Sequence, residues 1–275
     1  MIATLSDVLN AAKADARAVA GLVCLGWEDM RAYAQAAELE GVPVILQAGP
    51  SCRRHTPLSV LGPMMRHCAE QVSVPVVVHL DHGNHIDECK MAIDAGFSSV
   101  MYDGSRLPLA DNIANTRAVV ELSRTAGVSV EGEIGFVGYA AGEASLGTDP
   151  QEAATFAQES GVDAMAISVG NVHLQQDSQT PLDVAAIEAI QAMTDVPLVI
   201  HGGSGVPASQ RAELARTSNI CKFNIGTELR AAFGASLRQV LAEQPEVFDR
   251  VQLLGQVEST LVTQAQQVLR SLRHG

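Results

Sequence analysis

Aromatic side chains and positive charges are both scarce in this 275-residue sequence. Phe, Trp and Tyr make up 4% of the residues, and 18 Lys and Arg stand against 31 Asp and Glu, for a formal net charge of -13 at pH 7. This balance has the wrong sign for a nucleic-acid backbone or an anionic membrane surface. We therefore expect neither nucleic acid nor a membrane as a partner. An anionic substrate would need a local source of positive charge or backbone N–H groups.

Paired cysteines, long apolar runs and linker-like segments are also missing. The five cysteines are odd in number and include no C-x-x-C pair, which is typical of free thiols in a reducing compartment. No apolar run approaches the roughly 18 residues of a membrane-spanning helix, and the amino terminus lacks the pattern of a signal peptide. The sequence thus predicts a cytoplasmic protein. No Pro/Gly/Ser-rich tract divides the chain into separate domains.

Short apolar, β-branched runs recur eight times, separated by Ala-, Leu- and Glu-rich segments with helical spacing. Such alternation predicts an α/β fold with a parallel sheet. Eight units in this length favour a single (β/α)8 TIM barrel over residues 1–275, with an extra C-terminal helix from about residue 244 packed on the outside. An open, doubly wound sheet is the alternative. The runs cover residues 18–24, 42–47, 74–80, 98–102, 128–134, 164–169, 196–201 and 220–225.

Histidines stand at the ends of three of these predicted strands. His79, His82 and His85 accompany the third run, His173 follows the sixth, and His201 ends the seventh. The carboxyl ends of barrel strands converge on one mouth, where three neutral imidazoles with an open fourth position would make a catalytic Zn²⁺ site. Spacing alone does not decide which histidine of the first group is the ligand. We favour His82 because it lies at the rim.

Six segments at or near the strand ends form a set in a fixed order along the chain. They are HLDHG (79–83), GFSSVMYDGS (96–105), VEGEIG (130–135), GNVH (170–173), HGGSGVP (201–207) and KFNIGTELR (222–230). The set resembles the class II, zinc-dependent fructose-bisphosphate and tagatose-bisphosphate aldolases, which are aldehyde-lyases. The resemblance covers almost the whole chain and implies the same barrel fold.

The resemblance also implies a reaction and roles for particular residues. It implies that His82, His173 and His201 bind one catalytic Zn²⁺ per subunit, and that Asp81 exchanges a proton with the substrate hydroxyl. A ketose phosphate or bisphosphate would be cleaved reversibly to dihydroxyacetone phosphate and an aldehyde, with the enediolate stabilised by Zn²⁺. Glu133 resembles a carboxylate that meets the metal in an alternative position, although a rim ion pair would explain it equally well.

Two glycine-containing segments follow the seventh and eighth runs, where barrels commonly bind phosphate on loop N–H groups and a helix amino end. The resemblance implies that these segments hold the phosphate of dihydroxyacetone phosphate. We also expect Gln47, at the end of the second run, among the substrate contacts, and Asp103 close to the site. The phosphate-binding candidates are Gly202, Gly203, Ser204, Asn224, Gly226 and Thr227.

The sequence departs from the family pattern mainly on the substrate side. Gly49 replaces a Ser or Thr that helps to hold a distal phosphate, and Leu174 replaces a Gly near the proximal phosphate. The loop that carries the family's glutamate for the carbon-3 proton is shorter, and we expect Glu143 to take that role. Arg53 and Arg54 either form a solvated loop or hold an anionic group at the far end of the substrate. The aldehyde therefore need not be glyceraldehyde 3-phosphate.

Two further functions stay open at this point. Leu174 favours a metal-dependent aldolase whose donor is unphosphorylated or pyruvate-like. A non-catalytic partner subunit of an aldolase is the other alternative, but Asp81 and the three histidines argue against it, because a scaffold needs no open metal site. The expected partner is a small sugar phosphate, and the family suggests a homodimer or homotetramer.

Overall fold

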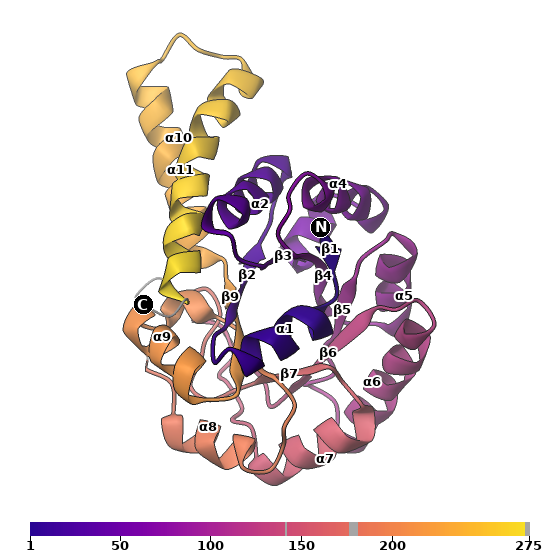
Figure 1. Cartoon of the computed structure of the whole chain (residues 1–275). Coiled ribbons are helices and arrows are strands. Elements are labelled where there is room, and N and C mark those ends of the chain that lie inside the picture. The colour runs from indigo at the N-terminus through magenta and orange to yellow at the C-terminus, as the bar shows by residue number, and fades with distance from the viewer. Residues whose placement is uncertain (141, 176–180, 273–275) are drawn as a thin grey trace.

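Eight parallel strands close into a barrel in the computed structural model, which describes residues 1–140, 142–175 and 181–272 (Figure 1). Each strand pairs with its neighbour in chain order, and the last pairs with the first, β2 with β9, in parallel. This confirms the predicted TIM barrel. The barrel strands are β2 (Val19–Val23), β3 (Val44–Ala48), β4 (Val76–Gly83), β5 (Ser99–Tyr102), β6 (Ser129–Ile134), β7 (Ala164–Ile167), β8 (Leu198–Ile200) and β9 (Ile220–Ile225).

The eight predicted runs each contain or overlap one barrel strand, because strands buried on both faces are mostly apolar. One short strand was not predicted. β1 (Ile2–Ala3) pairs in parallel with Val76 and Val77 at the start of β4. Two residues are too few to show a strand pattern in a sequence.

Helices surround the barrel and pack their apolar faces on the outer side of the strands. Gly41 and Gly161 end two of them in the left-handed conformation, as expected for glycines just past a helix. The surrounding helices are α2 (Trp27–Glu40), α3 (Pro50–His55), α4 (Leu58–Glu70), α5 (Ile86–Asp94), α6 (Leu109–Arg124), α7 (Pro150–Ser160), α8 (Val184–Gln191), α9 (Ala208–Thr217) and α10 (Thr227–Glu243), with a short 3₁₀ turn, η1 (Gly203–Gly205).

Helix α1 (Leu5–Ala14) covers the amino-terminal end of the barrel, across which it lies in Figure 1. Its Leu5 and Leu9 are fully buried against residues near the starts of several strands, among them Val19, Ile45 and Val77. These contacts close that end with apolar side chains. A functional site is therefore expected at the opposite end, where the strands finish.

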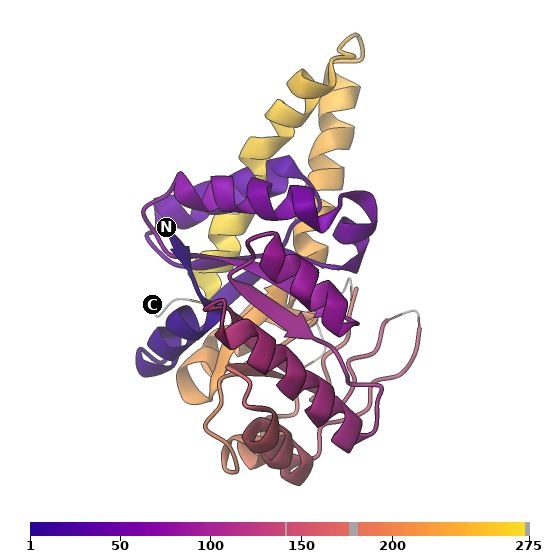
Figure 2. The same cartoon turned by 90° about the vertical axis from the view of Figure 1, so that its right-hand side faces the viewer.

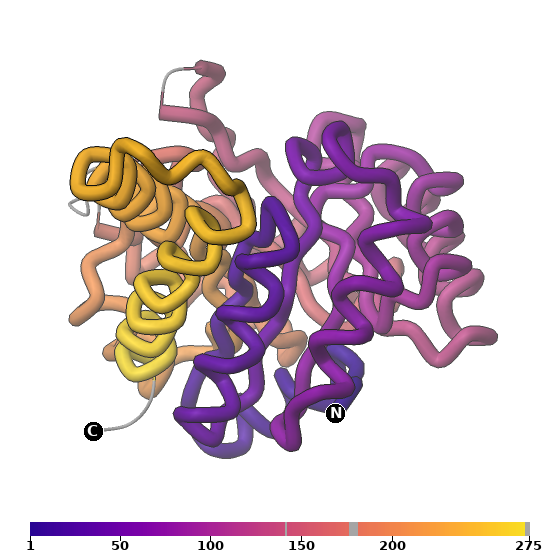
Figure 3. Tube along the Cα trace, turned by 90° about the horizontal axis from the view of Figure 1, so that it is seen from above, coloured from indigo at the N-terminus to yellow at the C-terminus, as the bar shows by residue number. Residues whose placement is uncertain are grey.

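The C-terminal region forms a longer helical feature than predicted. The extra helix begins at Arg250 rather than near residue 244, and α11 (Arg250–Ser271) pairs with α10 in an arm that projects from the barrel (Figures 1 and 2). The lower part of α11 packs beside α2, as Figure 3 shows from above. Phe248, in the turn between the two helices, is 94% exposed. No helix in the described ranges is long and apolar enough to cross a membrane.

Candidate active site

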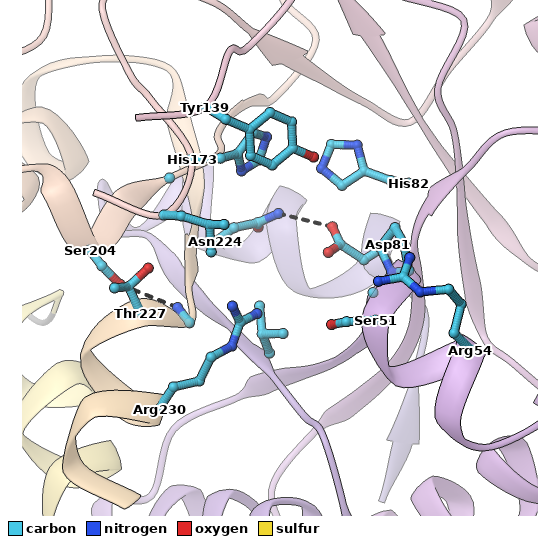
Figure 4. Close-up of a pocket in the computed structure, with 16 residues that line it drawn as sticks. Ser51, Arg54, Asp81, His82, Tyr139, His173, Ser204, Asn224, Thr227 and Arg230 are labelled. Carbon is cyan, nitrogen blue, oxygen red and sulfur yellow. Dashed lines mark hydrogen bonds between the residues drawn. The ribbon is translucent and has the colours of Figure 1, made fainter. Parts of the chain in front are cut away.

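A pocket lies at the carboxyl end of the barrel, and most of the predicted site residues meet there (Figure 4). Its walls are formed by residues at or after the ends of β2, β3, β4, β6, β7, β8 and β9. Because the strands are parallel, their chemistry-bearing ends necessarily share this edge. The predicted residues that line it are Arg54, Asp81, His82, His173, Gly202, Ser204, Asn224, Gly226 and Thr227.

His82 and His173 line one side of this pocket, and the fully buried His201 lies directly behind them. One ring nitrogen of each lies within 4.8 Å of those of the other two. The ring centroids are 4.6 Å apart for His82 and His201, 5.1 Å for His82 and His173, and 5.7 Å for His173 and His201. Three imidazoles in this arrangement could hold one divalent metal ion.

His82 is fixed in an unusual backbone conformation at the end of β4. Its φ of 55° lies in the left-handed region, which costs energy in a residue with a side chain and is common at functional sites. Nδ1 of His82 lies 2.7 Å from Oδ2 of Asp103, so Nε2 is left to face a ligand. Asp103 thus occupies the supporting position that the sequence suggested. Burial opposes protonation of His82, but the charge of Asp81 and the bond to Asp103 raise its pKa.

The surroundings of His201 fit a bound cation. Its Nε2 donates to Oε1 of Glu131 at 3.0 Å, while its Nδ1 lies 3.3 Å from Oε2 of Glu133. Nδ1 of His201 and Oε2 of Glu133 are both buried, and neither atom has a hydrogen-bond partner in the described part of the chain. Unpartnered buried polar atoms are rare, and an imidazole nitrogen facing a carboxylate oxygen is a common metal-binding pair. Glu133 also forms a second group of possible metal ligands with His82 and Asp103.

The protonation states of the other two histidines follow from their partners. Burial, reinforced by the charges of His82 and His201, lowers the pKa of His173 to about 3, so this imidazole is neutral, as metal binding requires. Burial alone would also lower the pKa of His201, but the bond to Glu131 and the charge of Glu133 outweigh it and raise that pKa to about 10. In the metal-free protein, His201 therefore carries a proton that a metal ion would displace.

A polar chain that sequence reasoning missed runs through the barrel interior below His201. Nζ of Lys222 lies 2.5 Å from Oε2 of Glu131 and 3.3 Å from Nε2 of His79, and Nδ1 of His79 lies 2.8 Å from Oγ of Ser99. All four side chains are fully buried. The signal was present in the strand pattern, because His79, Glu131 and Lys222 each stand two residues before a predicted site residue and so face the same interior.

Asp81 presents a carboxylate to the pocket. Oδ1 of Asp81 accepts a hydrogen bond from Nδ2 of Asn224 at 3.2 Å (Figure 4). Burial would raise the pKa of Asp81, but the nearby His82 and His201 lower it below its usual value. The group is therefore ionised at neutral pH and can accept a proton from a substrate hydroxyl.

Of the predicted phosphate-binding residues, Ser204 and Thr227 lie on the wall opposite Asp81, whereas Asn224 is bonded to Asp81 (Figure 4). Oγ of Ser204 accepts from the backbone N of Gly226 at 3.2 Å, which joins the η1 turn to the start of α10. Gly202 has a φ of 65°, and a Cβ there would lie 2.2 Å from the carbonyl oxygen of Val172, so only glycine fits. Thr227 completes this wall, whereas Gly203 is buried behind it and does not line the pocket.

Arg53 and Arg54 differ in placement, and they lie on helix α3 rather than on a loop. Arg53 is turned inward, with its Nη1 2.8 Å from the carbonyl oxygen of Ala48 and 2.6 Å from that of Asp81, and its Nε 2.8 Å from Oε1 of Glu88. These contacts occupy its guanidinium and join α3 to the ends of β3 and β4, where Asp81 lies, so Arg53 is not free to hold a substrate. Arg54 is exposed and lines the pocket.

Gln47 and Glu143 are not brought to the pocket wall. Gln47 is fully buried beneath Gly21, and neither its Nε2 nor its Oε1 has a hydrogen-bond partner among the described residues. Glu143 is more than half exposed, with its Oε2 2.7 Å from Nη2 of Arg106. Several pocket residues were not predicted, among them an aromatic residue and an arginine. Tyr139 and Arg230 both line the cavity, but a lone aromatic or a lone helical Arg gives no distinctive sequence signal.

Comparison with known proteins agrees with this geometry. The family described as Fructose-bisphosphate aldolase class-II matches residues 3–274. A fructose-bisphosphate aldolase from Geobacillus stearothermophilus is 35% identical over 263 residues, covering 92% of this chain and 91% of the relative. A 6-phospho-5-dehydro-2-deoxy-D-gluconate aldolase from Bacillus licheniformis is 36% identical over 252 residues, covering 90% of this chain and 86% of the relative. Among solved structures, the YdjI aldolase from Escherichia coli K12 superposes with a TM-score of 0.85 at 26% identity, covering 99% of this chain and 97% of that one.

Proposed function

Because the chain belongs to the class II fructose-bisphosphate aldolase family, and is therefore a lyase, we propose that it reversibly cleaves a ketose phosphate to dihydroxyacetone phosphate and an aldehyde. The observation that supports this reaction best is the cluster of His82, His173 and His201, two of which line the same pocket as the Asp81 carboxylate. A carboxylate beside three metal-ligating imidazoles supplies both the base and the Lewis acid that an aldol cleavage needs.

Zn²⁺ is the ion that we propose for the three histidines, since nitrogen ligands with an open position suit it. When bound, the ion supplies a Lewis acid that polarises the substrate ketone. The other steps belong to the protein. Asp81 accepts the proton from the carbon-4 hydroxyl as the bond between carbons 3 and 4 breaks, and returns it in condensation. Asn224 holds the Asp81 carboxylate in place through its 3.2 Å hydrogen bond.

The donor phosphate would lie against Ser204, Gly226 and Thr227. The start of α10 offers backbone N–H groups here, and the Ser204 hydroxyl already bridges to the N–H of Gly226. A phosphate at a helix amino end is favoured by these N–H groups and by the helix dipole. The Arg230 guanidinium lies beside Gly226 and adds a positive charge to this wall.

We propose that the aldehyde carries an anionic group at its far end. The names of the two relatives point to different far ends, a phosphate for the fructose-bisphosphate aldolase and a carboxylate for the gluconate enzyme. In this chain Arg54 from α3 and Arg230 from α10 both reach into the pocket (Figure 4). Nε of Arg230 is buried without a hydrogen-bond partner in the described part of the chain. Two planar guanidinium groups could bind either anion.

A panel of aldehydes tests this function. Zn²⁺-loaded protein is given dihydroxyacetone phosphate with carboxylated, phosphorylated and uncharged aldehydes of similar length, before and after chelation. Condensation that requires the metal supports the proposal, and condensation that survives complete chelation contradicts it. Arg54→Ala should raise KM for the anionic aldehydes at least about 10-fold, in line with a lost charge-assisted hydrogen bond of about 1.5–3 kcal/mol. Arg117→Ala, on the exposed surface of α6, is the matched control, and equal effects on charged and uncharged aldehydes would refute the role of Arg54.

A second donor class is favoured by one observation. Leu174 is 52% exposed, lines the pocket and has a φ of 57°, so a bulky side chain stands close to the donor-phosphate wall. A pyruvate-like or unphosphorylated donor would need less space there. The same panel with pyruvate or dihydroxyacetone in place of dihydroxyacetone phosphate separates the two donors. The cytoplasmic location and the homodimeric or homotetrameric state stay predictions from the sequence.

A further inference from the structure

Arg53 binds the backbone at the end of β4, a contact that the proposed reaction leaves without a role. Its Nη1 donates to the carbonyl oxygen of Asp81 at 2.6 Å, and its Nη2 donates to that of His82 at 2.8 Å. Nη1 also donates at 2.8 Å to the carbonyl of Ala48, the last residue of β3. One planar guanidinium therefore binds the two consecutive carbonyls of the candidate base and a candidate metal ligand.

Two consecutive carbonyls can face one guanidinium only where a strand is irregular. In an extended strand successive peptide units alternate in direction, so neighbouring carbonyls point to opposite sides. The register of β4 with β5 shifts between Leu80 and Gly83, and His82 has a φ of 55° within this irregular stretch. Because peptide units are planar, the φ and ψ of His82 set the angle between its own carbonyl and that of Asp81. The bond of both carbonyls to Arg53 therefore depends on the left-handed turn at His82.

The same contacts hold this turn against relaxation. A left-handed residue with a side chain persists only where its surroundings fix it. The pairing of β4 with β3 ends at Leu80 and Ala48, so the two bound carbonyls lie beyond the last paired residue of β3, and Arg53 supplies donors in place of a strand.

Glu88 at the start of α5 fixes Arg53 in turn. Its Oε1 accepts from Nε of Arg53 at 2.8 Å, and its Oε2 accepts from the backbone N of Asn84 at 3.0 Å. The Arg53 side chain is 7% exposed, so little water competes for its donors. The guanidinium thus joins α3 and α5 to the turn.

We propose that Arg53 is a positioning residue, which fixes the left-handed turn at His82 and thereby aligns the Asp81 carboxylate with the His82 imidazole. This inference rests on the proposed aldolase reaction. Asn224 holds the Asp81 carboxylate and Asp103 holds the His82 ring, but only Arg53 among these groups acts on the backbone that carries both (Figure 4). Because the direction of a side chain follows its backbone, relaxation of the turn would move the carboxylate and the imidazole together.

Arg53→Met keeps an unbranched side chain at this position and removes all of its donors. At saturating Zn²⁺, kcat for ketose phosphate cleavage should fall about 10- to 100-fold, since a displacement of about 1 Å at a catalytic group can cost that much. The Zn²⁺ affinity of the metal-free protein, measured by titration, should also fall about 10- to 100-fold, because His82 is displaced. KM for the ketose phosphate should stay within about threefold, since Arg53 does not line the pocket.

Arg211→Met is the matched control. The Arg211 side chain is 6% exposed and forms an ion pair with Glu228 at 2.8 Å, as Arg53 does with Glu88, but this pair joins α9 to α10 and not to β4. Its kcat and Zn²⁺ affinity should match those of the unaltered protein.

A second variant separates the fork of hydrogen bonds from the charge, and carries the test if Arg53→Met does not fold. Arg53→Lys keeps a positive charge but cannot bind both carbonyls and Glu88 as a planar guanidinium does, so its kcat and Zn²⁺ affinity should also fall. Full activity and affinity in Arg53→Lys, or a rise in KM alone in either variant, would overturn the proposal. If the unaltered, Zn²⁺-loaded protein cleaves no ketose phosphate, the proposed function fails, whereas the Zn²⁺ titrations still decide whether Arg53 positions His82.

Discussion

Lys222 and Glu131 form a fully buried ion pair below the candidate metal site, and replacing Lys222 with methionine should destabilise the barrel strongly. The two charged atoms are 2.5 Å apart. At an effective dielectric constant of about 20, charges at this separation attract by about 7 kcal/mol, and desolvation of both groups offsets part of this. Removal of Lys222 takes the ammonium partner from the buried Glu131 carboxylate and leaves it only the bond to His201, so we expect a loss of up to about 3–5 kcal/mol in the free energy of unfolding.

Urea denaturation of the chelated protein measures this loss, and a double-mutant cycle isolates the pair. Glu131→Gln should cost a similar amount, because it leaves the Lys222 ammonium beside a neutral His79 whose pKa is lowered to about 3 by burial and by Lys222. The double variant Glu131→Gln with Lys222→Met should lose less than the sum of the single losses. Glu131→Gln should also weaken Zn²⁺ binding about 10- to 100-fold, since Glu131 orients His201. Single losses below about 1 kcal/mol, or fully additive ones, would refute the reasoning.

Three further outcomes follow from the same geometry. Asp81→Asn should lower kcat for ketose phosphate cleavage about 100- to 10,000-fold in a coupled assay. Proton exchange into dihydroxyacetone phosphate should stay measurable by NMR. Undiminished cleavage would exclude Asp81 as the base. In the metal-free protein the pKa of His201 is raised from 6.5 to about 10 on folding. Protonated His201 therefore stabilises the fold fully below pH 6.5, and this stabilisation is lost as the pH rises toward 10. Urea midpoints that do not fall over this pH range would contradict the raised pKa. Zn²⁺ binding near pH 8 should therefore release about one proton, seen by calorimetry in buffers of different ionisation enthalpy, and no release would mean that His201 is already neutral.

The sequence predicted the barrel well because the fold depends on a pattern that is local and repeated. Most of the buried parallel strands are apolar over most of their length, so eight such runs were visible without knowledge of their partners. The elements that were missed or misplaced lack such a pattern. β1 has two residues, and α3 begins at Pro50 directly after β3, where a six-residue helix resembles a loop. The arm formed by α10 and α11 depends on packing between helices that the sequence does not display.

The site residues that stand at strand ends could be predicted from the sequence. The direction of a side chain could be predicted less well where it depends on contacts with other segments. His82, His173 and Asp81 needed only the shared edge of the barrel to come together. Arg53 and Arg54 are adjacent in sequence, yet one faces three backbone carbonyls and the other the pocket, because neighbouring helical positions point about 100° apart.

Other positions depend on contacts between distant segments. Glu143 and Tyr139 lie opposite each other across one loop. The side chain of Glu143 therefore faces Arg106, while that of Tyr139 faces the cavity. The ion pair of Lys222 with Glu131 joins residues 91 positions apart. The strand pattern indicates that Lys222 and Glu131 face the barrel interior, but neither their pairing nor the direction of Glu143 can be read from the local sequence.

Proton exchange at carbon 3 of dihydroxyacetone phosphate tests the central claim most directly, since it needs the donor site and the metal but no aldehyde. In D₂O, the Zn²⁺-loaded protein should replace one carbon-3 hydrogen with deuterium. Exchange should stop after chelation, return when Zn²⁺ is restored, and be absent from a His173→Ala variant. Exchange that continues in the fully chelated protein, or that never occurs in the Zn²⁺-loaded one, would contradict a metal-dependent aldolase acting on dihydroxyacetone phosphate.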